Sequence, residues 1–248
     1  RILSESEARN EARIDPLTGC HNRRSMAPAM NELNRRAQAD DRRIAVLLID
    51  LDNFKHINDV HGHTAGDAVL REVAARMRTI LPTDALIARM GGDEFAIAIM
   101  HDRSAQQEIE TLAEVLIEAV AEPIAINDFT IDTSMSVGIV GCRDVPPALP
   151  EEEWPNEMMH KADIAMYHAK KHGKSRSVCF EPVMEQELKF RNQLENGIRA
   201  GIAAGEFVPF YEQQVDVESG RITGFEMLAR WQSPALGLVG PDIFIPIA

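Results

Sequence analysis

Four acidic residues occur at predicted strand ends or turns, where their side chains would be accessible. Asp50 and Asp52 follow an apolar run, and a strand spacing of two puts both carboxylates on one face of a sheet. Asp93 and Glu94 follow Gly91-Gly92, a pair that favours a tight hairpin whose tip a ligand can approach closely. Alone, each acid is an ordinary strand-end or turn residue. Together they suit Mg²⁺ or Mn²⁺, which bind one or two carboxylates plus substrate phosphates.

Basic and amide side chains follow at positions suited to a nucleotide. Lys55 comes just after the strand, and Asn58, His63 and Asp67 lie in a glycine-containing stretch that we interpret as a loop. Amide and carboxylate side chains match the donor and acceptor edge of guanine. Two lysines lie four residues apart at the end of a predicted helix, where they could bind a triphosphate. Two lysines with this spacing are more often simply exposed to solvent on one face of the helix. These cations are Lys170 and Lys174.

The elements that must position these residues mix helices and strands. Polar residues 2–14 resemble the end of an incoming helix, which Asp15-Pro16 stops. Periodicity predicts helices at 23–39, 65–80, 104–121, 158–171 and 183–204. Strands are predicted at 42–54, 85–90, 95–100, 129–140 with a possible break, 178–181, 207–215 and 221–231. This order favours an α+β domain with helices packed on a central sheet, followed by a smaller unit from about Pro182.

Composition excludes several classes of protein. The 248 residues are 45% apolar, too many for a disordered chain. A net charge of −13 lacks the basic excess of a protein that coats nucleic acid, so a bound polyanion needs metal and a few local cations. The longest apolar runs have six residues, against about 20 for a membrane span.

Location and completeness can also be inferred. Three cysteines without metal or redox spacing, Cys20, Cys142 and Cys179, indicate free thiols in a reducing cytoplasm. The chain starts at Arg1 without a signal peptide, so we expect a piece of a longer protein, with a possible membrane anchor upstream.

Four segments together carry a family resemblance. DPLTGCHNRR (15–24), IDLDNFKHINDVHGHTAGD (49–67), RMGGDEF (89–95) and ADIAMYHAKKHGKS (162–175) resemble the diguanylate cyclases, the GGDEF family. The resemblance covers about residues 12–180 and implies a palm-like nucleotide cyclase fold with a mostly antiparallel sheet. It implies condensation of two GTP into cyclic di-GMP and two pyrophosphates. Because each domain supplies one GTP, a homodimer is required.

The resemblance implies roles for the acidic positions. Asp50 and Asp93 would bind the metal ions together with the Leu51 carbonyl. Glu94 would be a further ligand or help to activate the 3′-hydroxyl, and Lys55 would balance charge on the phosphates.

Other positions are implied to bind the substrate. Asn58 and Asp67 would read guanine with His63 nearby, while Lys170 and Lys174 would hold the β- and γ-phosphates. Lys174 stands where the family usually has arginine. This is expected to weaken phosphate binding, because a guanidinium donates two parallel hydrogen bonds and an ammonium acts as a point charge.

The second unit resembles the start of a cyclic di-GMP phosphodiesterase, the EAL family, whose domain is an α/β barrel. The motif reads Glu226-Met227-Leu228, and Glu226 would be one of several metal ligands. Glu212-Gln213-Gln214 departs from the usual Gln-Pro-Gln, which weakens the case for nucleotide contact there.

These observations predict a linker helix at 1–14, a cyclase domain at 15–180 and an EAL-type unit at 181–248. Two functions remain open. The first is an active cyclase, favoured by the complete Gly91–Phe95 motif. The second is a GTP-binding module that regulates a downstream phosphodiesterase, favoured by Lys174 and the attached second unit. A sensor domain is expected upstream in either case.

Overall fold

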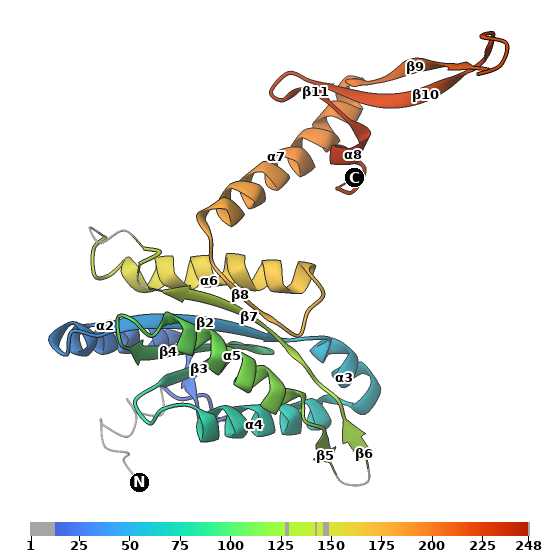
Figure 1. Ribbon diagram of the computed structural model, residues 1–248. Helices are drawn as coiled ribbons and strands as arrows, with labels where there is room; N and C mark the ends of the chain where they lie inside the picture. The colour runs from blue at the N-terminus through green and yellow to red at the C-terminus, as the bar shows by residue number, and fades with distance from the viewer. Residues whose placement is uncertain (1–12, 127–128, 142, 146–148, 248) are drawn as a thin grey trace. The chain divides into compact units, whose positions relative to one another are not determined.

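The computed structural model describes residues 13–126, 129–141, 143–145 and 149–247 (Figure 1). The chain divides into two compact units, Arg1–Met184 and Glu185–Ala248. The expected incoming helix falls almost entirely on residues 1–12, which lie outside the described residues. Arg13 and Ile14 form a turn and an isolated β-bridge to His21 rather than a helical turn.

A six-stranded sheet forms the centre of the first unit, in the order β1-β3-β4-β2-β7-β8. The four middle strands pair antiparallel, and the two edge strands, β1 and β8, pair parallel to their neighbours. The strands are β1 His21–Asn22, β2 Arg43–Leu51, β3 Leu86–Gly91, β4 Glu94–His101, β7 Met135–Gly141 and β8 Ser177–Cys179. The predicted α+β fold with a mostly antiparallel sheet is confirmed.

Helices cover both faces of this sheet. Helices α2 (Arg23–Ala39) and α6 (Trp154–Lys171) contact one face, and α4 (His63–Ile80) and α5 (Gln106–Ala121) cover the other (Figure 1). This explains why β2 is apolar from Ile44 to Ile49, where every residue is buried. Burial of each isoleucine, valine and leucine in this run contributes about 1.5–3 kcal/mol.

The predicted elements agree with the structure in most places and differ mainly at short or polar segments. Residues 57–61, expected in a loop, belong to helix α3 (Phe54–His61), which buries Phe54 and Ile57 and packs against α4. Helix α6 begins at Trp154, four residues before the prediction, with Pro155 in its first turn. The stretch 129–140 does break, into β6 (Phe129–Ile131) and β7. Strand β5 (Ile124–Ile126), which pairs with β6, was not predicted.

The second unit contains one long helix and a three-stranded antiparallel sheet. Helix α7 (Pro182–Ala204) starts just before the unit, and the strands are β9 Phe207–Val215, β10 Ile222–Ser233 and β11 Gly237–Val239. A short helix, α8 (Pro241–Phe244), follows. The core of this unit is small and centres on Trp231, which stacks on Phe207 with ring centroids 5.5 Å apart. No helix within the described residues is long and apolar enough to cross a bilayer.

Candidate active site

Three residues predicted as metal ligands, Asp50, Asp93 and Glu94, lie where β2 ends and β4 begins. Asp50 is the direct cross-strand partner of Glu94. The Leu51 amide donates a hydrogen bond to the Asp93 carbonyl at 3.3 Å, which ties the hairpin tip to the end of β2. The pairing of β2 with β4 therefore brings together residues that are more than 40 positions apart in sequence.

Lys170 is the partner of Asp50. Its Nζ lies 2.7 Å from Asp50 Oδ2, and the Asp50 side chain is only 13% exposed. No basic residue adjoins Asp50 in the sequence, and the last turn of α6 brings this cation to the end of the sheet. The family resemblance implied that Lys170 binds the triphosphate. The structure shows that Lys170 also pairs with Asp50.

The carboxylates at this edge disfavour one another's ionised forms. Burial raises the pKa of Asp50, and Asp93 and Asp52 raise it further, whereas the hydrogen bond and charge of Lys170 lower it. Burial also raises the pKa of Glu94, assisted by Asp50, Asp163 and Asp93. A cation brought to this cluster would relieve both the repulsion and the cost of burial.

Asp163 is a member of this cluster that the sequence analysis did not assign. It lies on α6, seven residues before Lys170, and its charge contributes to the raised pKa of Glu94. The signal was present, since residues seven apart lie on the same side of a helix.

Asp52 shares the sheet face of Asp50 but has a different part in the structure. Its side chain is buried and accepts hydrogen bonds from the Ser134 and Ser136 hydroxyls, both at 2.8 Å, and from the Ser175 amide at 3.0 Å. These bonds join β2, β7 and the segment after α6. Asp52 therefore links these three segments at the end of the sheet.

The hairpin between β3 and β4 is held from outside by Arg89. Gly92, at φ +51°, turns its carbonyl toward Arg89, which donates from Nε at 3.0 Å and from Nη2 at 2.8 Å. Arg89 Nη1 also lies 3.3 Å from Asp15 Oδ2. Burial disfavours the ionised form of Asp15, but hydrogen bonds from Thr18 and the charge of Arg89 outweigh it and lower the pKa.

Replacing Arg89 with alanine is expected to release the Gly92 carbonyl and loosen the hairpin that carries Asp93 and Glu94. Arg89 is a positioning residue, so amide hydrogen exchange at Gly92 and Asp93 should accelerate. The control is Arg71→Ala on the exposed face of α4. Unchanged exchange in the Arg89 variant would contradict the positioning role.

The residues predicted to contact the nucleotide lie on two helices. Asn58 and His63 were expected in a loop, Lys55 just after the strand, and Asp67 where that loop enters the predicted 65–80 helix. Lys55 and Asn58 belong to α3, His63 begins α4, and Asp67 lies one turn later. The two helices approach closely at Gly66, where a Cβ atom would lie only 2.0 Å from Asn58 Oδ1. Asn58 therefore packs on Gly66, the residue before Asp67. Asn58 and Asp67 are half-buried, while Lys55 and His63 are exposed. Their nucleotide roles stay predictions.

Lys174 does not share a helical face with Lys170. Helix α6 ends at Lys171, and Lys174 has a left-handed backbone with φ +61°. Its Nζ donates to Asn53 Oδ1 at 2.8 Å. The predicted spacing along one helix end is therefore wrong, yet both lysines reach the segment around the end of β2.

Glu226 lies on β10 with an exposed side chain, directly opposite Glu212 on β9. Nearby, Arg230 Nη2 is 4.0 Å from Glu212. Within the described residues, no three His, Cys, Asp or Glu side chains converge to enclose a metal ion by themselves, either here or at the Asp50 edge.

Comparison with known proteins gives matches to two families along the chain. The family described as "Diguanylate cyclase, GGDEF domain" matches residues 12–176, and the EAL domain family matches residues 192–248. The bifunctional diguanylate cyclase/cyclic di-GMP phosphodiesterase MucR of Pseudomonas aeruginosa is 36% identical over 234 residues, covering 94% of this chain and 33% of MucR. The cyclic di-GMP phosphodiesterase PdeR of Escherichia coli is 32% identical, covering 100% of this chain and 36% of PdeR.

Solved structures of GGDEF domains are similar to the first unit of this chain. The GGDEF domain of TpbB (YfiN) from Pseudomonas aeruginosa has a TM-score of 0.64 at 33% identity, covering 71% of this chain and 99% of that one. DgcB from Caulobacter crescentus, solved in complex with c-di-GMP, has a TM-score of 0.61 at 26% identity, covering 70% and 88%. The chain spans about a third of the length of the curated relatives it matches.

Proposed function

The chain belongs to the GGDEF family over residues 12–176 and continues into the first part of an EAL domain, and on this premise we propose that it condenses two GTP into cyclic di-GMP and two pyrophosphates. The convergence of Asp50, Asp93, Glu94 and Lys170 at one sheet edge carries the proposal. Attack of a 3′-oxygen on an α-phosphorus produces charge at both the nucleophile and the leaving pyrophosphate. Carboxylates for a metal and a lysine for phosphate are the groups this chemistry needs.

A divalent metal fits the donor set at this edge. The carboxylates of Asp50 and Glu94 both have raised pKa values, so they form a site whose charge a cation would balance. Asp50, Asp93 and Glu94, with the Leu51 carbonyl, would hold Mg²⁺ or Mn²⁺, and substrate phosphates would complete the ligands, as is usual for Mg²⁺. The metal would supply charge stabilisation and a more acidic 3′-hydroxyl.

The chain's own cations would divide the remaining work. Lys170 pairs with Asp50 and so lies where the triphosphate must approach the carboxylates. Lys174, tied to Asn53, would contact the phosphates from the other side of the β2 end. Asn58 and Asp67, on facing helices, would bind guanine.

The reaction requires two copies of the domain, because each holds one GTP and the product joins two. A homodimer in which the strand ends that carry Asp50, Asp93 and Glu94 face each other would satisfy this requirement. The activity of the whole protein, including any upstream sensor and the rest of the EAL domain, belongs to the same proposal.

A second candidate is a GTP-binding module that regulates a phosphodiesterase. The observations favouring it are Lys174 in place of the usual arginine and the 32% identity to a relative named as a phosphodiesterase, PdeR. Under this candidate GTP binds but product does not form.

The test is incubation with GTP and Mg²⁺ at several protein concentrations, with cyclic di-GMP detected by mass. A cyclase that works as a dimer should show a rate per protein molecule that rises with concentration below the dimer dissociation constant and then levels off. GTP binding without product would favour the regulatory module. A rate per molecule independent of concentration down to full dissociation would contradict the dimer requirement.

A further inference from the structure

Arginine side chains gather at the end of the sheet opposite the carboxylates. Arg43 begins β2, Arg103 follows β4, and Arg143 follows β7. Because Asp50 lies near the other end of β2, about 3.3 Å of rise per residue separates it from Arg43 by roughly 23 Å. Anything bound among these arginines is therefore remote from the proposed GTP site.

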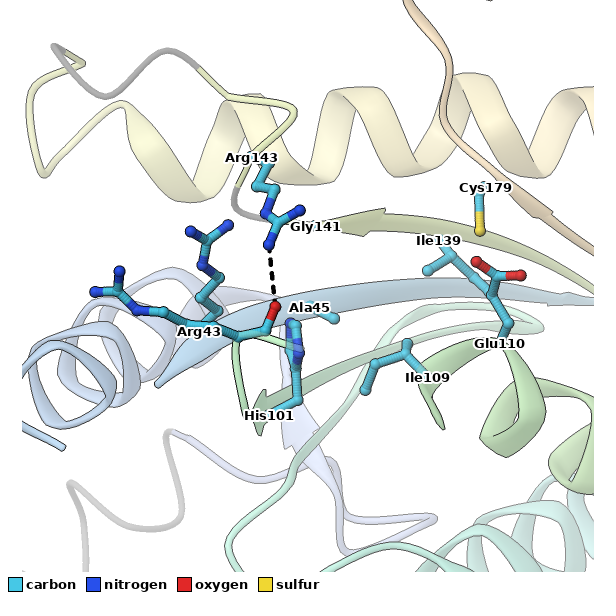
Figure 2. Close-up of a pocket in the computed structure, with 10 residues that line it drawn as sticks. Arg43, Ala45, His101, Ile109, Glu110, Ile139, Gly141, Arg143 and Cys179 are labelled. Atoms are coloured by element: carbon cyan, nitrogen blue, oxygen red, sulfur yellow. Dashed lines mark hydrogen bonds between the residues drawn. The ribbon is translucent and has the colours of Figure 1, made fainter. Parts of the chain in front are cut away.

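A groove of about 660 Å³ runs between these arginines and the helices beside them. It is lined by Arg35, Arg42, Arg43, Arg103 and Arg143, and Trp154 lies on its wall. A small pocket of about 20 Å³ adjoins it and shares Arg43, Arg103 and Arg143. Figure 2 shows Arg43, His101 and Arg143 at one end of this pocket, with Glu110 and Cys179 at the other.

Three of the arginines are paired with carboxylates. Arg35 Nε lies 3.3 Å from Glu151, an acidic residue that also lines the groove. Arg42 Nη1 lies 3.7 Å from Asp84, and its Nε lies 3.5 Å from Asp102. Arg103 forms an ion pair with Asp41. These pairs place a carboxylate beside each of these guanidinium groups and balance its charge.

Arg43 and Arg143 differ from the others, because neither has a carboxylate within ion-pair distance among the described residues. Arg143 instead donates to the Arg103 carbonyl at 3.0 Å, which holds it over the pocket. Burial lowers the pKa of His101, and the charges of Arg43, Arg42 and Arg143 lower it further, although its hydrogen bond to the Asp102 carbonyl raises it. Like charges are therefore concentrated here without full compensation.

Such an excess is not a general property of this chain, whose net charge is −13. Guanidinium forks bind phosphate oxygens in pairs, and two uncompensated forks on neighbouring strand ends match one phosphate or diphosphate group. The groove is larger than a single phosphate requires, which leaves room for the group that carries it.

We propose that this groove binds a phosphorylated small molecule, with Arg43 and Arg143 as the anion-binding residues. The site is separate from the carboxylate edge and does not depend on the proposed cyclase activity. A ligand here would contact the starting ends of β2 and the finishing ends of β4 and β7, the strands that also carry Asp50, Glu94 and Ser136.

The test is calorimetric titration of the whole chain with pyrophosphate in low-salt buffer containing EDTA. We expect saturable binding that weakens at least 10-fold in the double variant Arg43→Glu/Arg143→Glu. Arg71→Glu, an equal charge change on the exposed face of α4, should bind like the unchanged protein. Lys174→Ala should do so as well, because pyrophosphate held at the GTP site would involve that lysine.

Three results would overturn the proposal: no saturable binding at millimolar pyrophosphate, equal affinity in the double variant, or loss of binding in Lys174→Ala. If the double variant fails to fold, Arg143→Gln gives the same test. Its side chain is exposed and donates to one carbonyl, so a loss of affinity with an unchanged melting temperature would support the site.

Discussion

Replacing Asp93 with alanine is expected to lower cyclic di-GMP formation by about 10³-fold, equivalent to about 4 kcal/mol of lost transition-state stabilisation. Asp93 lies at a hairpin tip, where its side chain is half-buried and its backbone carbonyl, which alanine keeps, is bonded to Leu51. The substitution therefore removes a proposed metal ligand and little packing. Turnover of GTP at saturating Mg²⁺, followed by mass detection of the product, measures the loss.

The matched control is Glu118→Ala, which removes one carboxylate from the exposed face of α5 and should leave turnover unchanged. The melting temperature of Asp93→Ala should stay within a few degrees of the unchanged protein's. Turnover by Asp93→Ala close to that of Glu118→Ala would remove Asp93 from the catalytic assignment. A large fall in melting temperature would show that Asp93 has a structural part instead.

The four central strands of the sheet could be predicted from the sequence because they are largely apolar or end at glycines, whereas the two-residue edge strand β1 was not predicted. β2 and β4 read as buried runs, and Gly91-Gly92 placed the hairpin between β3 and β4. Helix α3 was missed for the opposite reason. It has eight residues, of which only Phe54 and Ile57 are buried, and its polar positions resemble a loop. Its stability comes from packing on α4, which local sequence does not reveal.

The candidate site shows the same division. The residue types and the approximate positions of Asp50, Asp93 and Glu94 followed from strand ends and a turn. The ion pair between Lys170 and Asp50 joins residues 120 positions apart, and the bonds of Asp52 to Ser134, Ser136 and Ser175 join residues 82 to 123 positions apart. Without the fold, Asp50 and Asp52 are two similar acids on one strand face. The fold pairs one with a lysine at the site and uses the other to hold the strand ends.

Packing between β7 and α6 depends on a residue that no chemical motif identifies. Gly138 lies in the middle of β7, where α6 crosses it. A Cβ built at Gly138 would lie 2.0 Å from the Ala162 carbonyl oxygen and 2.3 Å from the Met166 amide nitrogen. Both are backbone atoms of α6, so no side-chain rotation can relieve the clash. The helix that carries Lys170 and Asp163 therefore rests directly on the strand.

Replacing Gly138 with alanine should consequently destabilise the first unit by about 3 kcal/mol, the upper range for overpacking a core, because the whole of α6 has to move. For a unit of this size that corresponds to a fall of roughly 6–12 °C in melting temperature. Gly141→Ala is the matched control in the same strand, since its Cβ would meet only Asp144 Oδ2 at 3.5 Å, an ordinary contact. Thermal unfolding followed by circular dichroism distinguishes the two variants. Equal melting temperatures would mean that α6 lies farther from β7 than described. A selective loss in Gly138→Ala, accompanied by weaker GTP turnover, would show that the distance between this helix and strand sets the position of Lys170 against Asp50.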